Sequence, residues 1–145
     1  MIISVSLKLK ALLITLVLAI PAFILGNVFW PPSPTLPAPT TSETPFLFIL
    51  NILEVISFGL GFAFLIIGAQ IANRVIGKNL LSKLTFISIA WILINWWPHD
   101  KLHSSIGYNI KDLLLIEYAF HVTLIAAGII LAYYFFTQVL KEKLT

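Results

Sequence analysis

The chain has 145 residues, of which 59% are hydrophobic and only 10% charged, and its mean hydropathy is +1.00. A soluble domain contains about 45–50% apolar and about 25% charged residues, so this composition indicates a protein whose solvent is lipid. The chain has no cysteine, which excludes disulfides, iron–sulfur clusters, thiolate metal sites and thiol catalysis within it. Its net charge of +3 is carried by scattered basic residues, which gives no support for nucleic-acid binding.

The first apolar span covers about residues 9–30 and follows the basic residues Lys8 and Lys10. It contains Pro21, which a membrane helix tolerates as a kink. A basic start before an apolar stretch also resembles a signal peptide, but no small-x-small cleavage site follows, so we expect a retained helix. The segment 31–45 is rich in proline, contains no Lys or Arg, and is predicted to be an extended outer loop.

Three further spans follow. The second covers about 46–72, and the third covers about 80–97 and closes with an aromatic pair before Pro98. Tryptophans at this position are typical of the aromatic belt at a membrane surface, and proline is expected to end the helix. The polar segment 98–109 is therefore predicted to be an outer loop, and the fourth span to cover about 110–138.

Charge asymmetry orients the spans. Only Lys101 and Lys111 lie among the segments on one side of the predicted membrane. The other seven basic residues lie on the opposite side, which the positive-inside rule assigns to the cytoplasm. We therefore predict an all-α integral membrane protein, a four-transmembrane-helix bundle with N and C termini cytoplasmic and with its outer segments facing the periplasm, lumen or exterior. The seven residues are Lys8, Lys10, Arg74, Lys78, Lys83, Lys141 and Lys143.

Three ionisable residues fall well inside the predicted spans, away from the span ends. Glu54 lies in the outer half of the second span, and Glu117 lies in the outer half of the fourth. His121 is one turn deeper than Glu117 on the same helix face. Ionisable groups at such depth are costly unless they are paired, metal-bound or hydrated, so they are candidate functional residues.

Polar and small residues recur at helical spacing in three spans, and we expect these faces to point into the bundle. The second span has Asn51, Glu54, Ser57, Gly61, Gly68 and Ala72 on one face. The third span has Ser88, Trp91 and Asn95, a stripe that reaches His99 and His103 if the helix continues past Pro98. The fourth has Glu117, His121, Ile125, Gly128 and Ala132.

The segment after the third span adds His99, Asp100 and His103. All three histidines of the chain are thus predicted to lie at the outer side, near carboxylates. Neutral imidazoles with carboxylates suit Zn, Fe, Mn or Cu(II), so we predict one metal with a supporting shell, or two metals bridged by carboxylates. The candidate ligands are His99, Asp100, His103, Glu117, His121 and Glu54. We expect His121→Ala and Glu117→Ala to abolish metal binding or activity.

The sequence leaves several functions open. In the first, the protein is a membrane metalloprotein whose metal acts on a lipophilic substrate or pins the outer loop. In the second, it is a metal-free membrane isomerase or hydrolase, with His121 as general base and Glu54 and Glu117 as acid or charge stabiliser. In the third, it is a b-type haem or quinone carrier, which is less favoured because His99 and His103 look interfacial.

A fourth interpretation is an accessory subunit that binds other membrane subunits, or that self-associates in the lipid bilayer, through its many aromatic residues. In a purely structural interpretation, Glu117 pairs with His121 and Glu54 is protonated, which forms a buried polar network. We recognise no family motif among these residues, and the four-helix plan alone does not determine function.

Overall fold

The structure is a computed structural model that describes residues 5–140, so Lys141 and Lys143 lie outside the described residues. The described part is helical and contains no strand. Four helical segments are long and apolar enough to cross a membrane: Ser6–Phe29, Thr44–Ala69, Leu80–Ile106 and Ile110–Gln138. The prediction of an all-α, four-span membrane protein is therefore confirmed.

The first three spans belong to single helices, α1 (Val5–Phe29), α2 (Thr44–Val75) and α3 (Leu80–Ile106). The fourth is a continuous rod in which α-helical and π-helical stretches alternate. Its parts are α4 (Ile110–Ile116), η1 (Glu117–Val122), α5 (Thr123–Tyr134) and η2 (Phe135–Val139).

The first turn of a helix has backbone N–H groups without helical partners, and specific residues compensate for them at the starts of three helices. The side chain of Asn79 accepts a hydrogen bond from the N–H of Ser82, 2.8 Å away, and caps α3. Asn109 caps α4 in the same way, through the N–H of Lys111. In α2, Pro45 occupies the first turn, where its missing N–H has no intrahelical partner to lose.

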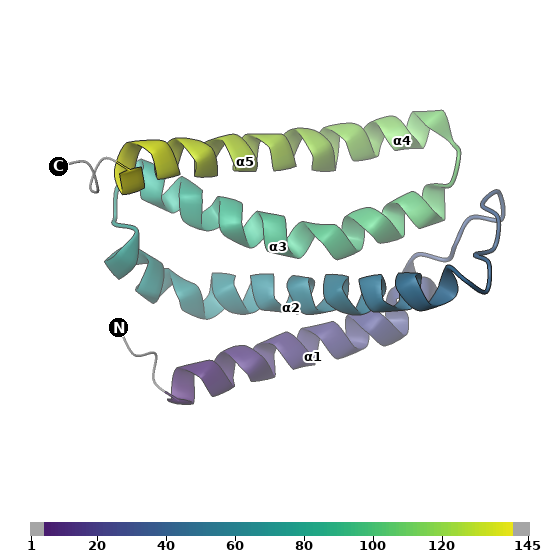
Figure 1. Cartoon of the computed structure of the whole chain (residues 1–145), viewed down its shortest axis with the longest axis horizontal. Coiled ribbons are helices and arrows are strands. Elements are labelled where there is room, and N and C mark those ends of the chain that lie inside the picture. Colours follow the sequence, from purple (N-terminus) through teal and green to yellow (C-terminus); the bar gives the residue numbers. More distant parts are fainter. Residues whose placement is uncertain (1–4, 141–145) are drawn as a thin grey trace.

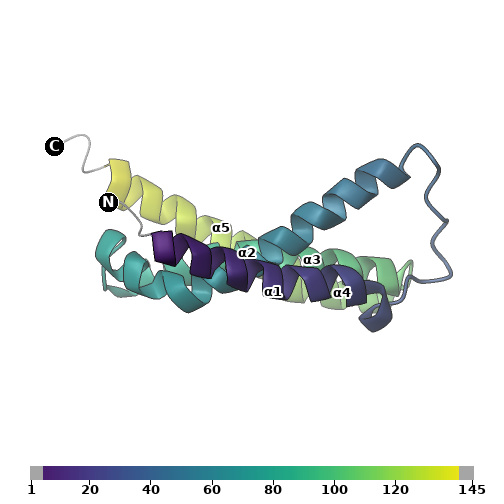
Figure 2. The same cartoon turned by 90° about the horizontal axis from the view of Figure 1, so that it is seen from below.

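Successive helices run antiparallel and lie side by side in chain order, with α1 against α2, α2 against α3, and α3 against α5 (Figure 1). The start of α1 and the end of η2 lie at one end of the molecule. The proline-rich loop 31–43 and the turn 107–109 lie at the other, which we call the loop end. Figure 2 shows α2 diverging from the other helices toward the loop end. Assignment of the loop end to the non-cytoplasmic side stays a prediction.

The third helix does not stop at Trp97, where the sequence places its end. It continues through Pro98 to Ile106, so the predicted loop 98–109 is mostly helical. Proline removes one backbone hydrogen bond, and a membrane helix tolerates this when neighbouring groups satisfy the freed carbonyls. The carbonyl that loses its N–H partner is that of Ile94, four residues before Pro98. Next to it, the carbonyl of Leu93 accepts a hydrogen bond from the hydroxyl of Ser57 in α2, 2.8 Å away.

Replacing Ser57 with alanine is expected to destabilise the protein by about 0.6 kcal/mol, the mean value of an interhelical hydrogen bond in a membrane. The measurement is the free energy of unfolding in mixed micelles. Thr137→Val is the matched control, because the hydroxyl of Thr137 donates to the carbonyl of Tyr133 and accepts from Gln138, both within its own span. Equal losses in the two variants would contradict the role given to Ser57.

An aromatic contact near the loop end joins α3, α2 and Trp30, the residue that follows α1. Trp97 is 5% exposed, and its ring centroid lies 4.8 Å from that of Phe58 and 5.2 Å from that of Trp30. The prediction that Trp97 is a belt residue is therefore wrong, whereas its neighbour Trp96 is 48% exposed. Consecutive side chains on a helix point about 100° apart, so Trp96 can face outward while Trp97 faces the core.

Two glycines allow close approach of neighbouring helices. A Cβ atom on Gly59 would overlap the carbonyl oxygen of Thr15 in α1. A Cβ atom on Gly61 would lie 2.6 Å from the Ile94 side chain and 2.9 Å from the Ile94 backbone nitrogen in α3. The inward position predicted for Gly61 is thus confirmed, and so is that of Glu54, which is 8% exposed.

The inward face predicted for the fourth span is wrong at Glu117, which is exposed, and beyond His121. Ile125 is 63% exposed, and Gly128 and Ala132 are also exposed, whereas Ala127 is buried at 4%. Nearly every residue of α5 is apolar, so the sequence offers no contrast between its faces. The wider π turn of η1 also changes the angular position of every residue that follows it.

The proline-rich loop is fixed to the end of α3. The N–H of Ser33 donates to the carbonyl of Ser104, 2.9 Å away. The helix ends at Gly107, whose φ of +63° favours glycine, and whose N–H donates to the carbonyl of His103. The loop thereby covers the same end of α3 that carries the predicted ligands.

Candidate metal centre

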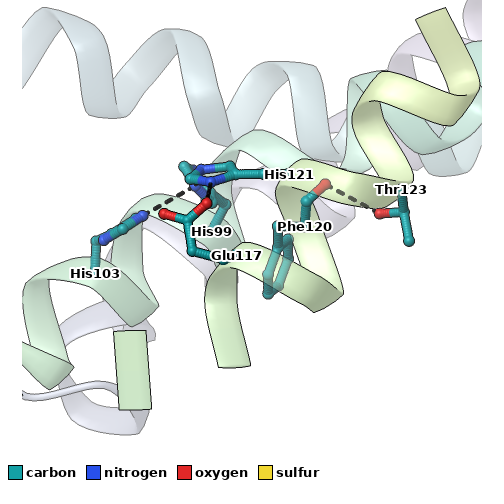
Figure 3. Close-up of polar contacts among 6 residues, drawn as sticks. All are labelled: His99, His103, Glu117, Phe120, His121 and Thr123. Carbon is teal, nitrogen blue, oxygen red and sulfur yellow. Dashed lines mark hydrogen bonds and ion pairs between the residues drawn. The ribbon is translucent and has the colours of Figure 1, made fainter. Parts of the chain in front are cut away.

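The three histidines converge near the loop end, where α3 packs against the fourth span. His99 and His103 lie one turn apart on α3, because the helix continues past Pro98, and His121 comes from η1. Their side chains point toward one another in Figure 3, and their ligand atoms all lie within 4.8 Å of one another. Among the described residues, this is the only group of three or more His, Asp or Glu side chains with such spacing.

The ring nitrogens are close enough to share one ion. The Nε2 atom of His99 lies 2.8 Å from Nε2 of His121 and 3.1 Å from Nε2 of His103. An ion bonded at about 2.1 Å to two imidazoles in tetrahedral geometry holds their nitrogens about 3.4 Å apart. Small side-chain rotations therefore suffice to place a metal among the three.

Glu117 orients one of the imidazoles. Its carboxylate lies 2.5 Å from Nδ1 of His121, one helical turn away. An ionised carboxylate accepts a hydrogen bond from Nδ1–H, which leaves the lone pair on Nε2, the atom that faces His99. Carboxylate–histidine pairs of this kind support the imidazoles of many metal sites. Glu117 thus supports His121, whereas the sequence also allowed it as a direct ligand.

The π-helical stretch η1 begins at Glu117 and contains His121. Short π-helical turns inside α-helices are found frequently at functional sites, because they widen one turn and redirect its side chains. This turn could not be predicted, because its residues Glu117–Val122 are also compatible with an ordinary α-helix.

Aromatic residues close the inner side of the cluster. The ring of Phe120 lies 5.5 Å from that of His99 and stacks on Trp91, at 6.2 Å between centroids. The indole N–H of Trp91 donates to the hydroxyl of Thr123, 3.0 Å away. Sequence reasoning placed Trp91 on the stripe that leads to His99, but it missed Phe120 and Thr123.

The opposite side of the cluster is open. The side chains of His121 and Glu117 are 35% and 54% exposed. At about 1.5 Å per residue, His99 and Glu117 lie about 10 Å along their helices from the loop end. The fourth span is 29 residues long, which is longer than a hydrocarbon core of about 30 Å requires. We therefore expect the cluster to lie near the boundary between hydrocarbon and headgroups.

The structure does not bring all six sequence candidates together. Glu54 is buried in α2 and is not part of the histidine cluster. Asp100 is exposed, lines a cavity with residues of α1 and α2, and forms no hydrogen bond with His103 among the described residues. His99 and Asp100 are consecutive on a helix, so their side chains leave it about 100° apart.

No family model matches the chain, and no curated protein and no solved structure matches it either. The apolar helices support a multi-pass membrane protein, and the histidine cluster can hold a metal ion. Any finer statement about function depends on the geometry of the site.

Proposed function

We propose that the chain is a membrane metalloprotein that binds one divalent transition-metal ion through His99, His103 and His121. The convergence of their three Nε2 atoms carries this proposal. His99 Nε2 lies within hydrogen-bonding distance of both other Nε2 atoms, yet it has one lone pair or one proton to offer. A metal ion satisfies all three nitrogens at once.

The donor set favours Zn²⁺ or Cu²⁺, with Fe²⁺ and Mn²⁺ as weaker binders of imidazole nitrogen. Three histidines with an open fourth position are typical of catalytic rather than structural zinc sites, which use four protein ligands. When bound, such an ion supplies Lewis acidity and activates water. The protein contributes the orientation of His121 by Glu117 and an apolar wall at Phe120. The open side near the headgroups favours a lipophilic substrate.

The geometry does not favour haem. Axial haem ligands approach the iron from opposite faces of a flat macrocycle. Here two histidines leave α3 one turn apart and meet the third within 3.1 Å or less of a common atom, His99 Nε2. The site accommodates a single ion and leaves no space for a macrocycle between the rings.

The test is elemental analysis of the full chain, purified through a tag that contains no histidine and reconstituted in lipid nanodiscs. We expect about one equivalent of Zn or Cu per chain, and we expect a chelator to remove it. Less than about a tenth of an equivalent after incubation with each metal would overturn the proposal. It would leave the Glu117–His121 pair as a metal-free acid/base dyad, the alternative that its 2.5 Å contact supports.

Glu117→Gln is expected to weaken metal binding about 10–100-fold without abolishing it, because the charge that orients His121 is lost while the three ligands remain. Competition with a metal-indicator dye measures the change in affinity. The matched control is Asp112→Asn, which removes a carboxylate from the same span; that carboxylate accepts a hydrogen bond from Asn109. Unchanged affinity in Glu117→Gln would show that the carboxylate does not support the site.

A further inference from the structure

A cavity with several polar side chains lies at the loop end, between the proline-rich loop and helices α1, α2 and α3. Its volume is about 750 Å³, which is within the range of small-molecule and headgroup sites. It is separate from the histidine cluster, because none of His99, His103 and His121 lines it. The polar side chains that line it include Asn27, Glu43, Asn51, Asp100 and Lys101.

Hydrogen-bond acceptors in this cavity lack partners. The Oδ1 atom of Asn51 is buried and has no hydrogen-bond partner among the described residues. The carboxylate of Asp100 forms no hydrogen bond with the described part of the chain, and Lys101 donates one, to Asn27 at 2.9 Å. Buried polar groups in proteins are almost always satisfied, so an unpaired one in a cavity wall indicates a ligand or water.

The charges favour a ligand with a positive group. Glu43, Asp100 and Lys101 all line the cavity, and the buried carboxyl of Glu54 lies within electrostatic range of both Asp100 and Lys101. The N–H and hydroxyl of Thr40 donate to Glu43 and hold the pKa of that carboxyl below its usual range. Two carboxylates therefore line the cavity with a single ammonium group, that of Lys101. This ammonium has three N–H donors and uses one of them for Asn27, so it can also bind a ligand.

Apolar residues form the rest of the lining. Leu36 of the loop and Leu47 and Leu50 of α2 line the cavity. The first turns of α2 diverge from the other helices (Figure 2) and leave Phe46, Leu47 and Leu50 largely exposed. An apolar tail can leave the cavity along these turns into the surrounding lipid.

We propose that this cavity binds the headgroup of a zwitterionic phospholipid that carries a primary ammonium and a phosphate. The ammonium group donates to Asp100, and it donates to Oδ1 of Asn51 once rotation of that amide turns the covered oxygen toward the cavity. Lys101 binds the phosphate. The acyl chains run past Leu47 and Leu50. A trimethylated choline headgroup offers no N–H donors and fits the unpaired acceptors poorly. This proposal is independent of the metal proposal, since the two sites share no side chain.

The test uses the full chain in detergent with equimolar phosphatidylethanolamine, phosphatidylcholine and phosphatidylglycerol, followed by native mass spectrometry of the retained lipid. We expect phosphatidylethanolamine to be enriched about 10-fold, the value of one good charge-assisted hydrogen bond. Asp100→Asn and Lys101→Gln are expected to remove this enrichment. Retention of the three lipids in equal amounts would overturn the proposal.

Matched controls separate the cavity from general surface charge. Asp112→Asn and Lys111→Gln remove the same charges from the first turn of α4, outside the cavity, and should retain the lipid as the unmodified chain does. Circular dichroism confirms that each variant is folded. Equal loss in the controls and the cavity variants would overturn the site assignment. Binding of soluble ethanolamine phosphate as tight as that of the lipid would overturn the assignment to a lipid.

Discussion

Replacing His99 with alanine is expected to eliminate stoichiometric metal binding and to lower the affinity by more than about 100-fold. Removing a residue that only hydrogen-bonds to a metal ligand lowers metal affinity by up to about 100-fold, and removing the ligand itself should lower it more. His99 lies at the centre of the cluster, because its Nε2 lies within 3.1 Å of Nε2 of both other histidines. Elemental analysis and dye competition in nanodiscs measure the effect.

Asp100→Asn is the control for this experiment. It changes the next residue of α3, which lies outside the histidine cluster, and it should leave the metal content unchanged. His103→Ala and His121→Ala should each reduce affinity as strongly as the His99 variant. A metal that stays at one equivalent in all three histidine variants would refute the site.

Gly59→Ala is expected to destabilise the protein by about 1–3 kcal/mol, the usual cost of overpacking a close contact. The added Cβ would overlap the backbone carbonyl of Thr15 and lie 3.1 Å from its Cα atom. Backbone atoms cannot rotate away, so α1 and α2 must separate. The free energy of unfolding in mixed micelles is the measurement.

Gly128→Ala is the matched control, because nothing lies within 4 Å of a Cβ atom built at Gly128. Both residues lie inside helices, so alanine improves helix propensity equally at the two positions, by about 1 kcal/mol. The difference between the variants therefore isolates the contact between α1 and α2. If both variants were equally stable, the close approach at Gly59 would not matter energetically.

The helical plan could be predicted because hydropathy determines it. Each span needs about 20 apolar residues, and the polar or proline-rich segments between them are clear in the sequence. Helix ends were less predictable: Pro98 is a helix breaker in water, but α3 continues through it to Ile106. Local sequence does not show that Ser57, distant in the chain, donates a hydrogen bond to the carbonyl of Leu93 in the turn before Pro98.

The candidate site was predicted in part. The spacing of His99 and His103, and of Glu117 and His121, identified the two helical pairs that meet in the structure. The sequence grouped Asp100 and Glu54 with them because all lie at a similar depth. Depth alone does not say on which side of its helix a side chain lies. Asp100 and Glu54 lie at a similar depth to the histidines, but their side chains are not part of the histidine cluster.

Faces were hardest to predict where a helix is uniformly apolar. Lipid and the protein interior are equally apolar, so Gly128 and Ala127 are equivalent by composition although only Ala127 is buried. In α2 the same reasoning succeeded at Glu54, because a polar group does distinguish interior from lipid.

The π turn of η1 has a mechanical consequence for the whole fourth span. A π turn holds one more residue than an α turn, so α4 and α5 are out of phase by about one residue, or about 100°. If the turn tightened to an ordinary α-helix, α5 would rotate about its own axis relative to α4. An ion that binds His121 together with the two histidines of α3 would oppose this rotation. The face that α5 presents to lipid would then depend on metal binding near the loop end.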